Sequence, residues 1–153
     1  MKKIILLISV VGFFAASAMA QGFGRRSTIT VAANGLNCST QLGAGIFPAL
    51  TWTLNSTDSI STNTGAGSGS GKVTSTATIT KRADACTPQL FEAAVESKLF
   101  GDVIVTHQDE HGHTYKITLK NTLISSYQLA GEQSESRPSE QITFAFESLT
   151  IAF

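Results

Sequence analysis

The chain has 153 residues, with 11 Lys and Arg, 11 Asp and Glu, and 3 His, so its formal net charge is zero. A neutral chain of this length excludes the basic surface that nucleic-acid binding requires, and it is long enough for one domain. Charged residues make up only 14% of the chain while Ser, Thr and Gly are plentiful, which favours an all-β fold with many turns.

The first twenty residues have the pattern of a secretory signal peptide. A positively charged start, an apolar run and a small-residue cleavage site follow one another: Lys2 and Lys3, residues 4–14, and Ala18-Met19-Ala20. A single membrane anchor is the alternative, but the run is shorter than the roughly 20 residues that a span needs. We therefore expect an exported chain of residues 21–153, periplasmic or secreted, without stable membrane insertion.

Cys38 and Cys86 are the only cysteines of the chain. In an oxidising compartment two cysteines most simply form one disulfide. That bond would close a loop of nearly fifty residues, a constraint worth about 4 kcal/mol in the chain-entropy model. Two buried free thiols are the alternative, and a cysteine pair with no histidine nearby is a poor zinc site.

The amino-terminal half predicts strands separated by loops. Residues 21–27 read as a flexible arm, residues 28–33 as a first strand and residues 46–54 as a second, with Pro48 near its start or at an edge. Residues 55–71 are rich in Gly, Ser and Thr, and their central part, residues 65–71, has no apolar residue larger than alanine. This composition predicts a long flexible loop. A third strand starts at Lys72.

A helical pattern interrupts the strands after Cys86. Thr87-Pro88 predicts an N-cap followed by proline at the first helical position. The apolar residues that follow have helical spacing and predict one face: Leu90, Phe91, Ala94, Val95 and Leu99. With Gly101 placed to end it, we expect one short amphipathic helix, residues 88–98, packed on a sheet.

The carboxy-terminal half returns to alternating patterns. Residues 103–107 and 115–119 alternate around a polar turn at 109–112, which predicts a hairpin, and residues 123–129 predict a further strand before a polar loop. In the last segment the apolar residues change from even to odd positions. Even positions hold Ile142, Phe144 and Phe146, and odd positions hold Leu149, Ile151 and Phe153. Either a bulge or bend lies at Glu147-Ser148, or the apolar face switches there.

These elements predict a mainly β protein, a small barrel or sandwich of six to eight antiparallel strands with one short α-helix packed on it. We expect a single domain over residues 28–153. An outer-membrane barrel is a poor alternative, because it needs at least about eight strands of about ten alternating residues. Residues 34–75 do not supply them.

No pattern in the chain predicts catalysis or a cofactor. The Gly-rich loop is not a phosphate-binding loop, because Lys72 is followed by Val73 and no helix follows. His107, His111 and His113 lie beside Asp109 and Glu110, but their places on and around a hairpin tip predict a solvated turn rather than a metal site. We therefore predict a protein that is not an enzyme and has no catalytic, cofactor-binding or metal-binding residues.

Three pairs of segments resemble a known family. They are Ile79-Thr80-Lys81-Arg82-Ala83-Asp84 with Thr87-Pro88-Gln89-Leu90-Phe91, Tyr115-Lys116-Ile117-Thr118-Leu119 with Leu123-Ile124-Ser125-Ser126-Tyr127, and Arg137-Pro138-Ser139-Glu140 with Phe144-Ala145-Phe146-Glu147. They resemble the strand-to-helix junction, the most recognisable segment and the closing strand of the Hcp (haemolysin-coregulated protein) family. Its members form the tube of the type VI secretion system. The resemblance covers about residues 28–153.

The resemblance implies a small β-barrel with one helix and a hexameric ring as the assembled state. It implies that rings stack into a tube whose lumen holds effector proteins, and that no residue is catalytic. Secretion-system components and effectors are then the expected partners besides the chain itself. For contact between stacked rings the candidates are Gly65, Gly67, Gly69 and Gly71 of the loop. Tube proteins of this family normally carry no cleavable signal, so a stand-alone periplasmic or secreted β-barrel binding module is the alternative.

Overall fold

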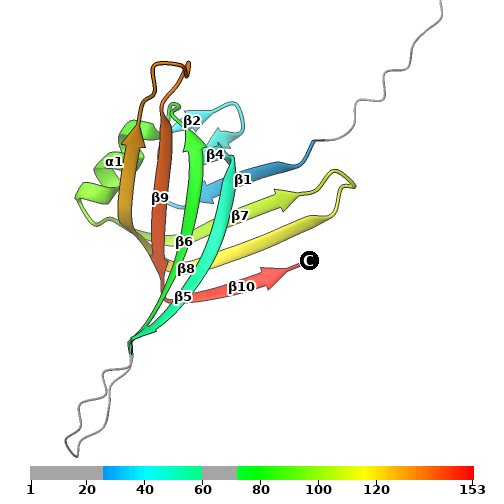
Figure 1. Ribbon diagram of the computed structural model, residues 1–153. Helices are drawn as coiled ribbons and strands as arrows, with labels where there is room; N and C mark the ends of the chain where they lie inside the picture. The colour runs from blue at the N-terminus through cyan, green and yellow to red at the C-terminus, as the bar shows by residue number, and fades with distance from the viewer. Residues whose placement is uncertain (1–25, 60–71) are drawn as a thin grey trace, which may run out of the picture.

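The computed structural model describes residues 26–59 and 72–153 and consists mainly of antiparallel strands (Figure 1). The strands are β1 (Thr28–Ala33), β2 (Ser39–Thr40), β3 (Gly43–Ala44), β4 (Ile46–Ala49), β5 (Thr51–Ser59), β6 (Lys72–Arg82), β7 (Leu99–Gln108), β8 (Thr114–Ala130), β9 (Ser139–Phe146) and β10 (Ser148–Ala152), and the helix is α1 (Thr87–Val95). The predicted mainly β class, with six to eight antiparallel strands and one short helix, is confirmed. No helix within the described ranges is long and apolar enough to cross a membrane.

Eight strands form one sheet in the order β4-β1-β7-β8-β9-β6-β5, with β10 also paired to β8, and β2 and β3 form a separate small hairpin. Strand β8 bends, because its first half pairs with β7 and β10 while its second half pairs with β9. The bend contains Asn121, whose φ is 49°, and a register shift between Ile124 and Ser126. The sheet therefore curls over its own core, and Figure 1 shows its two halves running in different directions.

The core lies between these two halves of the sheet. Its largest apolar side chains are fully buried: Phe47, Phe100, Phe144, Ile79, Leu90, Leu119 and Ile142. The rings of Phe100 and Phe144 meet edge to face with centroids 6.3 Å apart, linking β7 to β9. Because side chains alternate along a strand, every second residue over parts of β1, β6, β7, β8 and β9 faces this core.

The predicted second strand, residues 46–54, is wrong as a single element. Strand β4 pairs with β1, and β5 pairs with β6. Between them the chain turns at Leu50, whose N–H donates to the Thr80 carbonyl at 2.7 Å. Pro48 lies in β4, which is an edge strand of the sheet, where its missing N–H costs no ladder bond.

The predicted loop over residues 55–71 begins too early. Strand β5 continues to Ser59, and its register with β6 extends to the pair Ser59 and Lys72. Residues 55–59 are polar, so their composition does not predict a strand. Pairing with β6 satisfies their backbone groups. The rest of the predicted loop, with Gly65, Gly67, Gly69 and Gly71, lies outside the described residues.

The predicted helix is confirmed, but its start is wrong by one residue. Thr87 is the first helical residue and Cys86 occupies the N-cap, which makes no side-chain capping bond. The Thr87 hydroxyl is used elsewhere, since it accepts the Asp84 N–H at 2.8 Å and donates to the Glu140 carboxylate. Pro88 therefore follows the first helical residue, where its missing N–H is still harmless.

The helix also ends earlier than predicted, and Gly101 does not end it. Ser97 takes the left-handed conformation with φ 52°, and the Lys98 N–H donates to the Ala93 carbonyl at 2.9 Å. This is a Schellman-type end, in which glycine is the commoner residue at the left-handed position. Gly101 lies within β7 instead.

The predicted apolar face of the helix is only partly right. Leu90 and Ala93 are the buried residues of α1, whereas Phe91, Val95 and Leu99 are exposed. The helical period predicts that one face is buried, but the contact with β8 and the Cys86 bond decide its rotation.

The hairpin and the final segment follow the predicted pattern with two changes. Strands β7 and β8 pair as expected, but the two strands predicted at 115–119 and 123–129 are one long strand, β8. In the last segment Ile142 and Phe144 are buried on β9, and the chain then leaves that ladder at Glu147 to form β10. The change from even to odd apolar positions at Glu147-Ser148 therefore marks the step from the second half of β8, which pairs with β9, to its first half, which pairs with β10.

Candidate functional site

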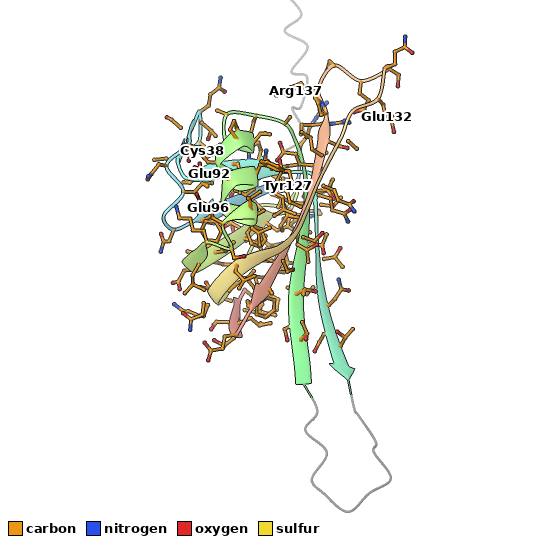
Figure 2. All side chains as sticks on the ribbon, turned by 90° about the vertical axis from the view of Figure 1, so that its left-hand side faces the viewer. Cys38, Glu92, Glu96, Tyr127, Glu132 and Arg137 are labelled. Carbon is orange, nitrogen blue, oxygen red and sulfur yellow. A yellow bond between two sulfur atoms is a disulfide. The ribbon has the colours of Figure 1, made fainter. Side chains whose placement is uncertain are left out.

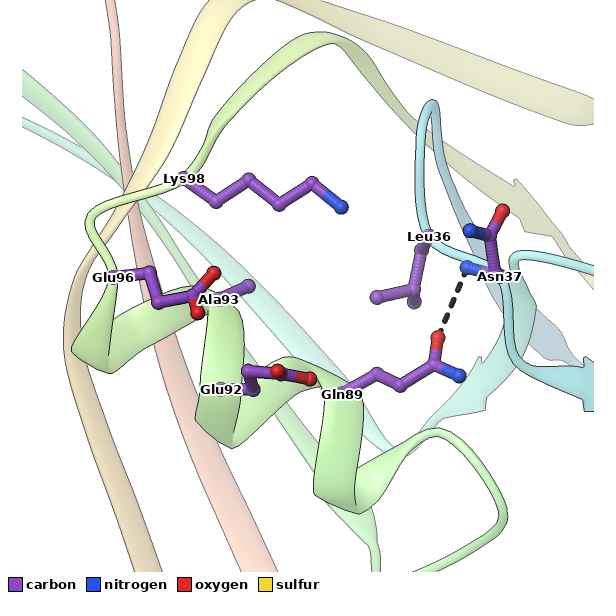
Figure 3. Close-up of a pocket in the computed structure, with 7 residues that line it drawn as sticks. All are labelled: Leu36, Asn37, Gln89, Glu92, Ala93, Glu96 and Lys98. Atoms are coloured by element: carbon purple, nitrogen blue, oxygen red, sulfur yellow. Dashed lines mark hydrogen bonds between the residues drawn. The ribbon is translucent and has the colours of Figure 1, made fainter.

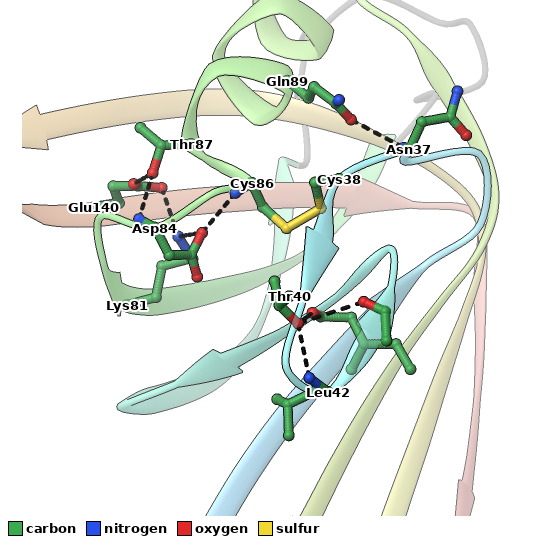
Figure 4. The surroundings of a disulfide bond; sticks show 12 residues. Asn37, Cys38, Thr40, Leu42, Lys81, Asp84, Cys86, Thr87, Gln89 and Glu140 are labelled. Atoms are coloured by element: carbon green, nitrogen blue, oxygen red, sulfur yellow. Dashed lines mark hydrogen bonds and ion pairs between the residues drawn. A yellow bond between two sulfur atoms is a disulfide. The ribbon is translucent and has the colours of Figure 1, made fainter.

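A disulfide joins Cys38, in the loop after β1, to Cys86, at the start of α1 (Figure 4). Their Cα atoms are 4.9 Å apart, and the bond spans a sequence separation of 48 residues. Both residues belong to the buried core. The bond therefore fixes the amino-terminal end of the helix against the loop after β1, in agreement with the pairing expected from the sequence.

A cluster of buried charges lies beside this disulfide. The Lys81 ammonium has all three donors used, by the Arg82 carbonyl at 3.0 Å, Asp84 Oδ1 at 2.9 Å and Glu140 Oε2 at 3.2 Å. Lys81 and Glu140 are fully buried, and Asp84 Oδ1 also accepts the Cys86 N–H at 2.8 Å. Buried charges are tolerated when they are paired and hydrogen-bonded in this way. The cluster thus connects β6, β9 and the start of α1.

Tyr127 of β8 extends this cluster. Its hydroxyl oxygen is buried and has no hydrogen-bond partner within the described part of the chain. Burial, followed by the negative charge of Glu140, raises the pKa of Tyr127 well above its usual value. The ring packs edge to face against Phe91 of α1, with centroids 5.6 Å apart. The same neighbourhood therefore holds the helix on the sheet at its start and at its middle.

A cleft of about 230 Å³ lies between the helix and the loop after β1 (Figure 3). Gln89 Oε1 accepts the Asn37 N–H at 2.9 Å across it, and the Lys98 ammonium donates to the Gly35 carbonyl at 2.8 Å. Glu92 and Glu96 line its helix side, and Figure 2 shows both on the outer surface of α1. The polar groups here hold the loop to the helix and do not converge on a reacting position.

A larger, open cleft of about 810 Å³ lies beside the β2–β3 hairpin. Arg137 and Asp84 line it together with apolar Leu42 and Pro48. Arg137 lies in the loop between β8 and β9 (Figure 2). Asp84 already serves Lys81 and the Cys86 N–H, so its carboxylate is a structural group.

The three histidines do not converge on a metal. Asp109 accepts the N–H groups of His111 and His113 at 2.9 Å each, and its second oxygen lies 2.9 Å from His113 Nδ1. The hydrogen bond from His113 lowers the pKa of Asp109. No group of three or more potential ligands is gathered within residues 26–59 and 72–153. The carboxylate organises the turn between β7 and β8, which is its structural role.

One exposed apolar surface lies on β10. Leu149 is 41% exposed, Ile151 45% and Phe153 92%. Leu149 and Ile151 pair with the buried residues Leu119 and Ile117 of β8, so they lie on the same face of the sheet as the core. Their own side chains remain exposed. Strand β10 has β8 as its one described partner, and its other edge is unpaired. We refer to Leu149, Ile151 and Phe153 as the β10 surface.

A second exposed apolar surface is formed by two residues of the helix and by Leu99, the first residue of β7. Phe91 is 55% exposed, Val95 69% and Leu99 62%. A shallow cavity of about 210 Å³ beside them is lined by residues of α1 and β8. We refer to Phe91, Val95 and Leu99 as the helix surface. Figure 1 shows α1 and β10 on different sides of the molecule.

Sequence reasoning found the disulfide cysteines but missed both surfaces. The helix surface was assigned to the core, because helical spacing does not show which face is covered. For the β10 surface the signal was present in the parity change at Glu147-Ser148, yet parity alone leaves open whether the new face is buried.

Comparisons with known proteins by family model and by structure point to the same family. A family model described as "Type VI secretion system effector, Hcp" matches residues 46–153. Hcp1 from Salmonella typhimurium superposes with a TM-score of 0.66 at 16% identity, covering 81% of this chain and 84% of the other. A type VI secretion system effector from Yersinia pestis gives 0.62 at 17% identity, covering 80% and 87%. The tube-terminating cap of the anti-feeding prophage gives 0.51 at 12% identity, covering 99% and 95%.

A search of curated proteins by sequence found no significant match. The structural likenesses are below 25% identity and show the fold, a barrel of the Hcp kind. The family model covers more than half of the chain, including β6, α1 and β8. The chain belongs to the family of type VI secretion system effectors called Hcp.

Proposed function

We propose that this chain is an exported, non-enzymatic structural protein that assembles with copies of itself into hexameric rings. The observation that carries the proposal is the pair of exposed apolar surfaces, the helix surface and the β10 surface, on different sides of one small protein. Surfaces of this kind mark protein interaction sites. Two different complementary surfaces produce head-to-tail contacts, which close into rings when the rotation between neighbours allows it.

The free edge of β10 supports the same assembly. Its unpaired N–H and C=O groups are a template for pairing with a strand of another chain. Strand β5 is one end of the strand order and also has one described neighbour, β6. Edge pairing would add backbone hydrogen bonds to the apolar contacts and fix the register between neighbours.

Family membership supports a role in a tube. Structures of similar fold are described as a type six secretion system protein, as a type VI secretion system effector and as the tube-terminating cap of the anti-feeding prophage. By analogy, rings of this protein stack, and the loop with Gly65, Gly67, Gly69 and Gly71 contacts the next ring. Deleting residues 65–71 should weaken stacking and leave the folded ring. Unchanged stacking in that variant would contradict the role of the loop.

The predicted signal peptide and the disulfide favour export to the periplasm or the exterior. They also favour the alternative, a stand-alone β-barrel binding module that keeps the fold without the tube. The two functions differ in the assembled state, because only the tube protein needs the ring. Partners besides the chain itself would be secretion-system components and effector proteins for the tube, and a ligand for the module.

The test is the native mass of residues 21–153 under non-reducing conditions, measured by light scattering. The ring predicts a species near six subunits. Leu149→Asp and Val95→Asp each place a charge in one surface and should give monomers with unchanged circular dichroism. Leu129→Asp, at an exposed position in neither surface, is the matched control and should keep the ring. A wild-type monomer at high concentration would favour the binding module.

A further inference from the structure

His107 connects the two halves of the sheet through its side chain. It lies on β7, which pairs with β1 and β8, whereas Trp52 lies on β5, at the far end of the strand order. Trp52 Nε1 is 3.4 Å from His107 Nδ1. On the other side of the imidazole, Nε2 is 2.7 Å from the Ser27 hydroxyl, immediately before β1. One ring therefore contacts a residue of β5 and a residue beside β1.

The chemistry of these partners fixes the protonation state of the ring. An indole N–H can only donate a hydrogen bond, so His107 Nδ1 must be the unprotonated acceptor. In a neutral imidazole the proton is then on Nε2, which donates to the Ser27 hydroxyl. The observed arrangement is that of a neutral histidine in a single tautomer.

Protonation would make the contact with Trp52 unfavourable. Both ring nitrogens of an imidazolium are donors, so the N–H of Trp52 would point at another N–H. The Trp52 and His107 rings are arranged edge to face, with an interplanar angle of 74° and centroids 6.4 Å apart. The edge of an aromatic ring is its positive part, which repels a cation. The bond to Ser27 survives protonation, because a hydroxyl can still accept.

The charged and titratable groups around His107 are few. From β8, Tyr115 is its cross-strand partner, with ring centroids 6.0 Å apart. From β1, the cross-strand partner is uncharged Ile29, and from β5 the contact is with uncharged Trp52. At the tip of the hairpin, Asp109 is two residues along the chain and is engaged by His113. The carboxylate and the phenol ring favour a cation, whereas the Trp52 edge opposes it.

We propose that His107 is a pH-sensitive clasp, which holds edge strand β5 against β7 while it is neutral and releases it when protonated. Histidine is the side chain that ordinarily changes charge between about pH 5 and pH 8. Protonation of His107 would loosen one edge of the sheet and leave its other ladders intact. The clasp acts within one chain, so it does not depend on ring formation.

Trp52 is the only tryptophan of the chain, so its fluorescence reports directly on this contact. The full mature chain, residues 21–153, would be titrated between about pH 8 and pH 5. We expect a single fluorescence transition in the wild type. It should be absent in His107→Gln, whose amide can make both hydrogen bonds but cannot gain a charge. His113→Gln is the matched control and should keep the transition. A transition that persists in His107→Gln, or a flat wild-type titration, would overturn the proposal.

Hydrogen exchange tests the release itself. After correction for intrinsic rates, protection of the β5 amides should be about threefold to tenfold lower at acidic than at neutral pH, the factor for one net hydrogen bond. Protection in β9 should not change. Equal β5 protection at both pH values would show that protonation releases nothing. If His107→Gln does not fold, the nitrogen chemical shifts of the wild-type histidine rings test the proposal instead. They must show His107 as the Nε2-protonated tautomer at neutral pH.

Discussion

Lys81 and Glu140 face each other across the β6–β9 ladder, with their charged atoms 3.2 Å apart and both side chains fully buried. The Lys81 ammonium also lies 5.5 Å above the Phe47 ring. An ion pair of this kind adds little net stability compared with apolar residues, but losing one partner leaves a buried charge uncompensated. The pair therefore makes the junction between β6, β9 and α1 sensitive to single substitutions.

Replacing Lys81 by methionine should destabilise the protein severely. Glu140 would remain as a buried carboxylate and Asp84 as a partly buried one, both without their cation, at a cost of about 3–5 kcal/mol in the free energy of unfolding. Urea denaturation measures this change. Lys120→Met is the matched control, because the Lys120–Asp102 pair is exposed to solvent and is worth about 1 kcal/mol or less. A similar loss in both variants would show that burial of the Lys81 charge is not the cause.

Removing the disulfide should lower stability while keeping the fold. The Cys38→Ala and Cys86→Ala double variant loses a constraint over 48 residues, worth about 4 kcal/mol in the chain-entropy model. Both sulfur atoms belong to the buried core, so a reductant should act on the native protein slowly. We expect the thermal midpoint of the wild type to fall towards that of the double variant only after complete reduction. An unchanged midpoint in the double variant would contradict a stabilising role.

Tyr127 should make stability fall in alkaline solution. Its folded-state pKa is raised by burial and by Glu140, so the neutral phenol is favoured in the native state. A raised pKa contributes stability below the unfolded value, near about 10, and that contribution is lost as pH rises further. Tyr127→Phe should therefore lose less stability than the wild type above about pH 10.

Ionisation of Tyr127 can be measured by absorbance, because the chain has only one other tyrosine. Tyr127→Phe and Tyr115→Phe each leave a single tyrosine, so phenolate absorbance can be followed one residue at a time. Tyr127 should ionise at a higher pH in the folded protein than in the urea-unfolded chain. Ionisation of Tyr127 at the pH seen in the urea-unfolded chain would rule out the effect of its surroundings.

Ser97→Gly should stabilise the protein. Ser97 has a φ of 52° at the end of α1, a conformation that costs a residue with a side chain about 1–2 kcal/mol. Glycine removes that strain and loses part of the gain to its more flexible unfolded chain, so we expect a net gain of about 0.5–1 kcal/mol. Glu96→Gly, one residue earlier at φ −82°, should instead destabilise. Thermal unfolding of both variants distinguishes a local conformational effect from a general effect of glycine.

Local patterns in the sequence predicted most of the elements. Alternating apolar residues located the β7–β8 hairpin and β9, and Thr87-Pro88 located the helix start to within one residue. The predictions failed where a backbone partner distant in sequence decides the structure. Polar residues 55–59 are a strand because β6 lies beside them, and residues 46–54 divide at Leu50 because β1 and β6 are different partners.

The sequence by itself determined the mainly β class, the single short helix and the two cysteines available for a bond, because these depend on spacing and composition within the chain. The tertiary structure decided which face of the helix is covered, where β8 bends and that the β10 side chains remain exposed. It also brought Lys81 to Glu140 and Trp52 to His107. Such contacts depend on strand register across the whole sheet, and a shift of one residue in that register would turn every side chain to the other face.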